Sequence, residues 1–234
     1  MIIHSIFDLL AIILAFAANR FFRLQFKLKQ PAVLPDKYRY SFLLVLILGM
    51  ALGSILFGTV NTSLAGIPAL SKSLLGGIAG AVLFAEIFKK TIHIKGSTGF
   101  YFIPGLCVLI VIGRIGCYLA GLPDYTYGIQ TSVPWAVDFG DGVLRHPVQL
   151  YESFSMLFFL LLIFASYKKH TTFWLNKGFY LFIFFYAGQR FLWEFLKPYP
   201  TVTGPLNLFH LLAIAMMLYA TFMLWNTPKQ YSHV

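Results

Sequence analysis

GRIGCYLAGLPDYTYG, residues 113–128, and PWAVDFGDGVLRHPVQLYE, residues 134–152, form the stretch around which the chain is organised. The stretch leaves one strongly apolar segment, passes through a polar loop and enters a second apolar segment. Arg114 lies inside the first of these segments, where a central arginine costs roughly 2.5–3.5 kcal/mol in a membrane. An anionic partner must compensate this charge, so the stretch is a candidate functional site.

The composition of the whole chain indicates an integral membrane protein. Of the 234 residues, 59% are hydrophobic and 11% are charged. A water-soluble domain of this composition would expose large apolar patches. The formal net charge is +10, but the basic residues lie in short gaps between apolar runs. They therefore indicate topology and contacts to anionic lipid, and we expect no nucleic-acid partner.

Seven apolar runs are long enough to cross a bilayer, which predicts an all-α polytopic membrane protein with one domain over residues 1–234. The runs cover residues 2–22, 40–60, 74–89, 97–120, 147–167, 178–196 and 204–225. Pro104 and Gly105 predict a kink in the fourth helix. The first run is interpreted as a retained helix rather than a signal peptide, because Asp8 interrupts it and no lysine or arginine precedes it.

Lysine and arginine residues between the runs predict the orientation. They gather after runs one, three and five, whereas the opposite side holds Lys72, Arg145 and Lys197. The positive-inside rule therefore places the amino terminus outside the cell and the carboxyl terminus in the cytoplasm. In this orientation five runs bring polar residues to one level below the outer surface. These residues are Asp8, Arg114, residues 146–152, Arg190, Glu194, Asn207 and His210.

Residues 121–146 form the one sizeable segment expected on the outer side. PWAVDF indicates a short strand and GDG indicates a turn. We therefore expect a small hairpin or ordered loop that covers the site as a lid. With roughly 25 residues, it is too short to be a domain of its own.

Arg114 and Arg190 are predicted at the same membrane depth. Two guanidinium groups form a fork that binds a phosphate more strongly than a single point charge does. At this depth the natural phosphate belongs to a phospholipid headgroup. The alternative is structural, since Glu194 stands four residues after Arg190 and is placed to pair with it.

His146, Gln149, Tyr151 and Glu152 occupy the first turns of the fifth run. A histidine and a carboxylate near two arginines could supply a general base or orient an attacking group. The alternative is a helix-capping and interface belt, because tyrosine favours the headgroup level and acidic residues favour a helix start.

The two cysteines are not expected to bind each other or a metal. Cys107 and Cys117 are ten residues apart in one predicted helix, hence about 15 Å apart along its axis. The sequence contains neither CxxC nor HExxH, so we expect no metal site and no cofactor. Cys117 is interpreted as a small buried residue, because no base stands beside it in the sequence.

Three glycines in the third run, Gly76, Gly77 and Gly80, are typical of close helix packing. Access for a lipid chain is the alternative interpretation. Glu86 precedes Lys89 and Lys90 by three and four residues, so a local ion pair accounts for it.

Taken together, GRIGCYLAG, the YG that ends at Gly128, RHPVQLYE and RFLWEFLKP resemble the prolipoprotein diacylglyceryl transferase family over most of the chain. Members of this family act in the bacterial cytoplasmic membrane. They transfer the diacylglyceryl group of phosphatidylglycerol to the lipobox cysteine of a prolipoprotein and release glycerol phosphate. The resemblance implies that Arg114 and Arg190 match the two essential arginines. It also implies that Gly128 matches the conserved glycine after the signature and that Gln149, Tyr151 and Glu152 match the motif of the fifth helix. From the residues themselves, we expect catalytic roles for His146 and Glu152 and a substrate site that adds Gly113, Gly116, Glu194 and Asp8.

The chain departs from the family pattern at several polar positions. The signature carries asparagines and a glutamate where this sequence has Cys117, Ala120 and Leu122, and a histidine where it has Leu75. The phosphate-binding part is kept, whereas polar groups near the acceptor route are lost. Two alternatives stay open: the same chemistry with another acceptor, or a non-catalytic protein that binds or moves phospholipid. The sequence does not determine the oligomeric state.

Overall fold

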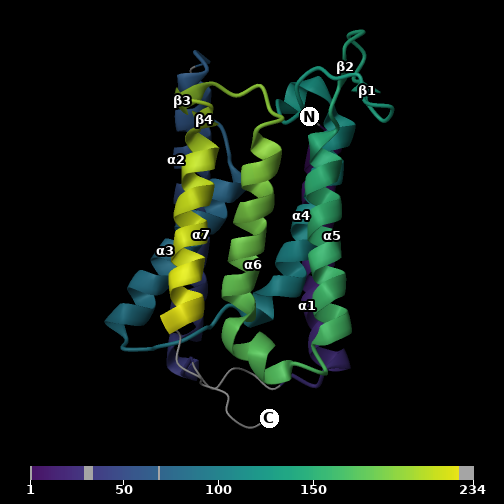
Figure 1. Cartoon of the computed structure of the whole chain (residues 1–234). Coiled ribbons are helices and arrows are strands. Elements are labelled where there is room, and N and C mark those ends of the chain that lie inside the picture. Colours follow the sequence, from purple (N-terminus) through teal and green to yellow (C-terminus); the bar gives the residue numbers. More distant parts are fainter. Residues whose placement is uncertain (1, 29–33, 68, 227–234) are drawn as a thin grey trace.

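The computed structural model describes residues 2–28, 34–67 and 69–226. These residues form α-helices that run up and down between two ends of the molecule (Figure 1). The helices are α1 (Ile2–Gln25), α2 (Arg39–Leu64), α3 (Leu74–Thr91), α4 (Ile103–Ala120), α5 (Val148–Ser166), α6 (Thr171–Glu194) and α7 (Leu208–Asn226). Each predicted apolar run overlaps one of these helices, so the all-α prediction is confirmed.

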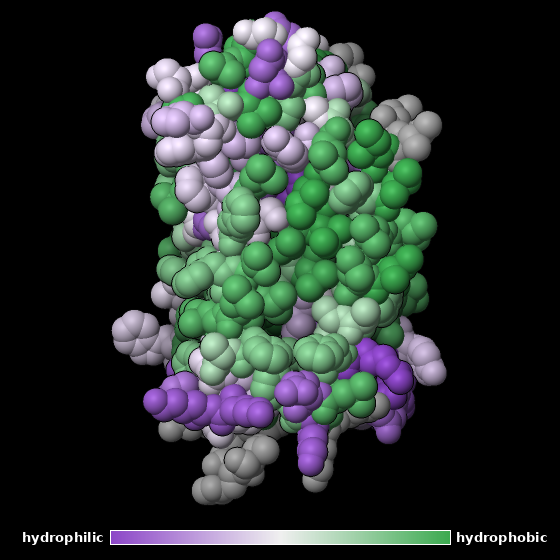
Figure 2. Space-filling model, turned by 90° about the vertical axis from the view of Figure 1, so that its right-hand side faces the viewer, coloured by the Kyte–Doolittle hydropathy of each residue, from purple (hydrophilic) through white to green (hydrophobic). Residues whose placement is uncertain are grey.

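Five of the helices are long and apolar enough to cross a membrane: α1, α2, α4, α5 and α7. A broad hydrophobic band crosses the middle of the face shown in Figure 2, with hydrophilic residues at both ends of the molecule. The two remaining helices, α3 and α6, carry charged residues within their length. The protein is therefore a membrane protein.

Three short 3-10 helices join or extend the α-helices: η1 (Asp36–Tyr38), η2 (Phe100–Phe102) and η3 (Leu122–Asp124). Because η2 precedes α4, this helix begins at Ile103 rather than at the predicted residue 97. Pro104 therefore lies in the first turn of α4, where its missing N–H leaves no intrahelical hydrogen bond unmade. Pro104 therefore gives no reason to expect a kink in α4, which continues to Ala120.

Glycines bring α2 and α3 into close contact. A Cβ atom on Gly80 would lie 2.1 Å from the carbonyl oxygen of Gly49, and one on Gly53 would lie 2.3 Å from the carbonyl oxygen of Gly76. Only glycine allows the two backbones to approach this closely. The helix-packing interpretation of the glycines in α3 is confirmed.

The hydrophobic core lies between α4, α5, α6 and α7, and it is built from aliphatic and aromatic side chains that are almost fully buried. They include Ile103, Cys107, Ile110, Met156, Phe159, Ile163, Phe182, Ile183, Tyr186, Ala213 and Met216. The neighbouring α1 packs along α4, where the backbone N–H of Gly105 donates to Asn19 Oδ1 at 2.7 Å. The core thus fixes the helices whose outer ends carry the polar residues.

One end of the molecule collects the beginnings of α1, α5 and α7 and the ends of α4 and α6 (Figure 1). Between α4 and α5, β1 (Val137–Asp138) pairs antiparallel with β2 (Leu144–Arg145), which confirms the predicted hairpin. A second antiparallel pair, β3 (Thr201–Thr203) and β4 (Leu206–Asn207), precedes α7. The predicted seventh run therefore starts four residues too early, because residues 204–207 belong to this second hairpin.

Candidate functional site

Arg114 and Arg190 converge on one carboxylate, that of Glu152. Arg114 Nε lies 2.6 Å from Glu152 Oε2, and Arg190 Nη1 forms an ion pair with Glu152 Oε1. The three side chains come from α4, α6 and α5 and are all buried. The helices thus bring together the two arginines that the sequence suggested, and an anion lies between them.

Lys197 and Glu194 complete a charged cluster with these three residues. Lys197 Nζ lies 2.6 Å from Glu152 Oε1 and 3.8 Å from Glu194 Oε2. Glu194 Oε2 also lies 2.7 Å from Arg190 Nη2, so the predicted pairing at this spacing is present. With three basic and two acidic side chains, the charged cluster has a formal charge of +1. It therefore favours one further anion.

Lys197 was not predicted as a site residue, since the sequence suggested only a topology signal. The sequence did offer one signal: Lys197 stands three residues after Glu194, a spacing at which the two side chains can pair. In the structure Lys197 is buried just beyond the end of α6. Burial, followed by the nearby positive charge of Arg190, lowers the pKa of Lys197, although Glu152 and Glu194 oppose the shift.

Two buried polar side chains without protein partners are close in the sequence to residues of the charged cluster. Among the described residues, neither amide atom of Gln149 or Gln189 has a hydrogen-bond partner, and both side chains are buried. Gln149 precedes Glu152 by one helical turn, and Gln189 is adjacent to Arg190. Leaving a buried polar group unpaired costs about 1–3 kcal/mol. Both amides are thus available to hydroxyl or carbonyl groups of a ligand.

His146 and Tyr151 contact each other at the base of the β1–β2 hairpin. His146 Nδ1 lies 3.2 Å from the Tyr151 hydroxyl, which also accepts a 2.6 Å hydrogen bond from Trp135 Nε1. A Cβ atom on Gly128 would lie 2.5 Å from the carbonyl oxygen of His146. Gly128 therefore lets the loop pack against His146, whose described ring contacts are to Tyr151 rather than to the charged cluster.

Gly113 and Gly116 have different surroundings. A Cβ atom on Gly116 would lie 2.4 Å from Phe7 Cβ, so this glycine allows α1 to approach α4. Nothing among the described residues lies within 4 Å of the corresponding position on Gly113. Gly113 thus faces open space on α4, and its place in the substrate site stays a prediction.

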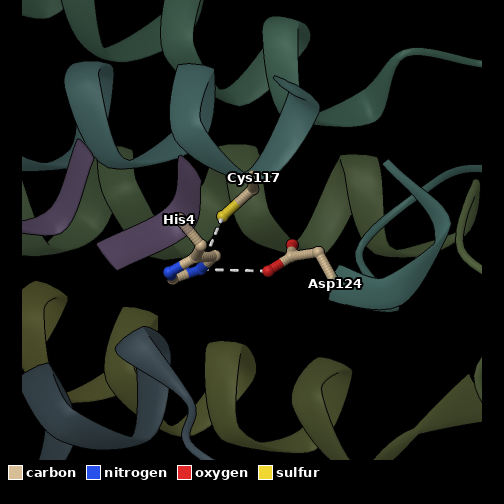
Figure 3. Close-up of side chains that lie close together, drawn as sticks. All are labelled: His4, Cys117 and Asp124. Carbon is tan, nitrogen blue, oxygen red and sulfur yellow. Dashed lines mark hydrogen bonds and ion pairs between the residues drawn. The ribbon is translucent and has the colours of Figure 1, made fainter. Parts of the chain in front are cut away.

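A second cluster is formed by His4, Cys117 and Asp124 (Figure 3), and Cys117 follows Arg114 by three residues on α4. His4 Nε2 lies 3.0 Å from Asp124 Oδ1 and 3.8 Å from Cys117 Sγ. Cys117 therefore has a base beside it in space, which the sequence could not reveal because His4 belongs to α1. Asp8, predicted in the substrate site, lies 2.9 Å from His4 Nδ1. Cys107 and Cys117 are both free, as predicted.

Two apolar cavities lie farther from this end of the molecule. One, of about 600 Å³, lies between α2, α3, α6 and α7 and includes Gly80 and Tyr219 in its lining. A smaller one, of about 110 Å³, lies near the start of α4. Glu86 borders both, pairs with Lys89 at 2.7 Å as predicted, and accepts a 2.8 Å hydrogen bond from the Tyr219 hydroxyl. Apolar linings of this kind suit hydrocarbon chains.

Comparison with known proteins links this geometry to one family. The family model described as prolipoprotein diacylglyceryl transferase matches residues 2–226. Three curated relatives are each named phosphatidylglycerol–prolipoprotein diacylglyceryl transferase. The Geobacter sulfurreducens protein is 30% identical over 198 residues, 76% of this chain and 72% of the relative. The Campylobacter jejuni protein is 28% identical over 217 residues, 83% of this chain and 76% of the relative.

The third relative, from Protochlamydia amoebophila, is 36% identical over 172 residues, which cover 64% of this chain but only 44% of the relative. The family match is broader, since it includes all seven described helices and thus every residue of the charged cluster. This chain therefore belongs to the prolipoprotein diacylglyceryl transferase family.

Proposed function

We propose that this protein is a membrane enzyme that moves the diacylglyceryl group of phosphatidylglycerol to the lipobox cysteine of a prolipoprotein and releases glycerol phosphate. The names of its relatives and the family match support this reaction. The observation that carries the proposal is the convergence of Arg114 and Arg190 on one buried anionic position. Glu152 fills that position, and the cluster still carries a formal charge of +1 that would attract a phosphodiester beside it.

All seven helices cross the bacterial inner membrane in the proposed arrangement, with the amino terminus outside and the carboxyl terminus in the cytoplasm. Lys89 and Lys90 end α3, and Lys168 and Lys169 join α5 to α6, so these lysines lie at the end opposite the charged cluster. The positive-inside rule assigns that end to the cytoplasm. The charged cluster then lies near the outer leaflet, and the β1–β2 hairpin covers it.

The headgroup of phosphatidylglycerol matches the charged cluster in charge and polarity. A phosphodiester carries one negative charge, which would neutralise the formal charge of +1 on the cluster. The unpaired amides of Gln149 and Gln189 would bind hydroxyl or ester oxygens of the lipid. The acyl chains extend toward the apolar cavity between α2, α3, α6 and α7.

The reaction replaces a carbon–oxygen bond by a carbon–sulfur bond. The acceptor thiol loses its proton to water, its sulfur attacks the glycerol carbon that bears the phosphate, and the bonding electron pair leaves with the phosphate oxygen. Arg114, Arg190 and Lys197 stabilise the charge that grows on this oxygen. Glu152 contacts all three cations, so we assign it the role of a counter-ion that positions them rather than that of a base.

Product analysis tests this function. Purified protein is incubated in detergent with labelled phosphatidylglycerol and a lipobox peptide, with a peptide whose cysteine is replaced by serine as control. We expect glycerol phosphate release together with a heavier cysteine peptide and no change in the serine peptide. Release without peptide modification would indicate another acceptor. Binding of the lipid without release would indicate a lipid-binding protein, in which the ion pairs are purely structural.

A further inference from the structure

His4, Cys117 and Asp124 come from three separate segments, α1, α4 and η3, and point toward one another (Figure 3). Their nitrogen, sulfur and oxygen donor atoms all lie within 4.8 Å of one another. Zinc bonds such atoms at about 2.0–2.3 Å in tetrahedral geometry, which places the ligand atoms about 3.3–3.6 Å apart. The observed separations of 3.0 and 3.8 Å from His4 Nε2 are close to this spacing.

The His4 ring lies between two carboxylates, so each ring nitrogen must carry either a proton or a metal ion where it faces its carboxylate. Nδ1 lies 2.9 Å from Asp8 Oδ2, and Nε2 lies 3.0 Å from Asp124 Oδ1. A neutral imidazole carries one proton, so its second nitrogen would face a carboxylate oxygen with a lone pair on each atom. Either a second proton or a metal ion resolves this contact. A proton joins only two of these atoms, whereas one metal ion would bond His4, Asp124 and the sulfur of Cys117 together.

The neighbours of the three side chains hold them as a metal site requires. Asp8 accepts a hydrogen bond from Nδ1, which directs the Nε2 lone pair at Cys117 and Asp124; metal-binding histidines commonly have such a partner. The Thr126 hydroxyl donates to the second oxygen of Asp124. Arg114 Nη1 also lies 4.0 Å from Cys117 Sγ.

We propose that this protein binds one zinc ion through His4, Cys117 and Asp124 and that the fourth position on the ion binds the acceptor thiol. A mixed nitrogen, sulfur and oxygen ligand set suits zinc, and three protein ligands with one open position are typical of catalytic zinc. One thiolate and one carboxylate neutralise the two charges of the ion. The His4 side chain is 35% exposed, which leaves a path to the outside.

The catalytic part of this inference rests on the proposed function. A free thiol has a pKa of about 8.5, whereas a thiol that coordinates zinc is deprotonated. The acceptor thiol would release its proton to water as it binds the ion. Its sulfur would then attack the glycerol carbon, the carbon–oxygen bond would break, and glycerol phosphate would leave with the electron pair. The neutral thioether product is a weak ligand and dissociates.

The relative position of the two clusters fits this step. Cys117 follows Arg114 by one helical turn of α4, and Arg114 Nη1 approaches the sulfur. The zinc ion therefore lies beside the arginine that would hold the lipid phosphate. Two residues of one helix, α4, would thus place the sulfur nucleophile next to the phosphate leaving group.

Metal binding to the purified full-length protein tests the site without reference to activity. Zinc content is measured by mass spectrometry, zinc affinity by competition with a chelator, and the ligands by the thiolate-to-cobalt absorption after exchange for Co²⁺. We expect one zinc per chain, at least about tenfold weaker binding in His4→Ala and Asp124→Asn, and loss of the thiolate absorption in Cys117→Ser. Asp8→Ala, which removes the hydrogen-bond partner of His4 Nδ1 without touching the three ligands, should weaken binding by about 10–100-fold.

Cys107→Ser is the matched control, because Cys107 is buried in the same helix outside both clusters and should retain zinc and the thiolate absorption. Equal zinc affinity in wild type and Cys117→Ser would overturn the proposal and indicate a proton-bridged ion pair. Full transferase activity of the metal-free protein would overturn the role of zinc and leave the transferase intact. Zinc bound through the three residues in a protein without transferase activity would establish the metal site and refute the proposed function.

Discussion

A buried arginine keeps its charge, so its neighbours determine what it can do. In the charged cluster, the guanidinium groups of Arg114 and Arg190 approach Glu152 from different helices. Each guanidinium has several donor positions in one plane, whereas an ammonium group is a compact point charge. The proposed binding of the lipid phosphate therefore depends on arginine as such and not only on positive charge.

Conservative replacement of the arginines tests this dependence. We expect Arg114→Lys and Arg190→Lys each to lower kcat by at least about 100-fold, as loss of one oriented donor to a developing anion does. Transferase assays and membrane insertion are measured in parallel. Arg39→Lys, on an exposed pair with Asp36 at the start of α2, serves as the control and should be neutral. Wild-type turnover in both cluster variants would remove the phosphate-binding role.

A substitution of Gln149 tests ligand binding separately from the stability of the protein. Its amide is buried without a partner among the described residues, so Gln149→Leu should not lower the thermal stability of the lipid-free protein. We expect the KM for phosphatidylglycerol to rise about tenfold, because a hydrogen bond to the headgroup is lost. A lower melting temperature with an unchanged KM would contradict this role.

The lowered pKa of Lys197 predicts how enzyme activity changes at high pH. Its pKa is lowered from the usual 10.5 by burial and by Arg190. A lysine loses its charge as the pH rises through its pKa, so the charged cluster would change from a formal +1 to neutral. We expect kcat/KM of the wild type to fall at alkaline pH, whereas Lys197→Arg keeps its charge and its activity there. The ratio of the two pH profiles isolates this group, and a constant ratio would contradict the prediction.

Among the helices, α2 and α3 pack most closely, and their contact depends on the absence of side chains. The carbonyl oxygen of Gly49 would lie 2.1 Å from a Cβ atom on Gly80, so any larger residue must separate the backbones. These helices also border the larger apolar cavity. Their spacing therefore controls both the stability of this side of the bundle and the shape of the space for a lipid chain.

Gly80→Ala should destabilise the protein by about 1–3 kcal/mol, the usual cost of overpacking. Gly188→Ala in α6 is the matched control, since its Cβ atom would meet Met217 Sδ at an ordinary 3.7 Å. We expect a lower thermal unfolding temperature in detergent for Gly80→Ala and an unchanged or higher one for Gly188→Ala. Equal unfolding temperatures of the two variants would show that α2 and α3 can move apart at no cost in free energy.

Several elements could be predicted from the sequence because their signals are local. Long apolar runs predicted the helices, and GDG between short apolar stretches predicted the β1–β2 hairpin. The positions of Pro104 and of β4 were misjudged, because hydrophobicity alone does not mark where a helix begins. Both errors concern helix ends, where capping and neighbouring turns compete with the apolar pattern.

For the molecule as a whole, residues at one level could be predicted, but the partners that lie on other helices could not. Helix direction placed both arginines near the outer surface, and the structure places them on one carboxylate. The proximity of His4, Cys117 and Asp124 depends on how α1 packs against α4, which no short motif encodes. The expectation of no metal site rested on contiguous motifs, whereas this cluster combines residues more than a hundred positions apart.

The ion pair between Arg114 on α4 and Glu152 on α5 also has a consequence for biosynthesis. A helix with one unpaired arginine near its centre costs roughly 2.5–3.5 kcal/mol in free energy when it enters the bilayer alone. The next helix to emerge from the ribosome supplies the neutralising carboxylate. The two helices can therefore partition into lipid together as an uncharged hairpin, before α6 delivers its own arginine.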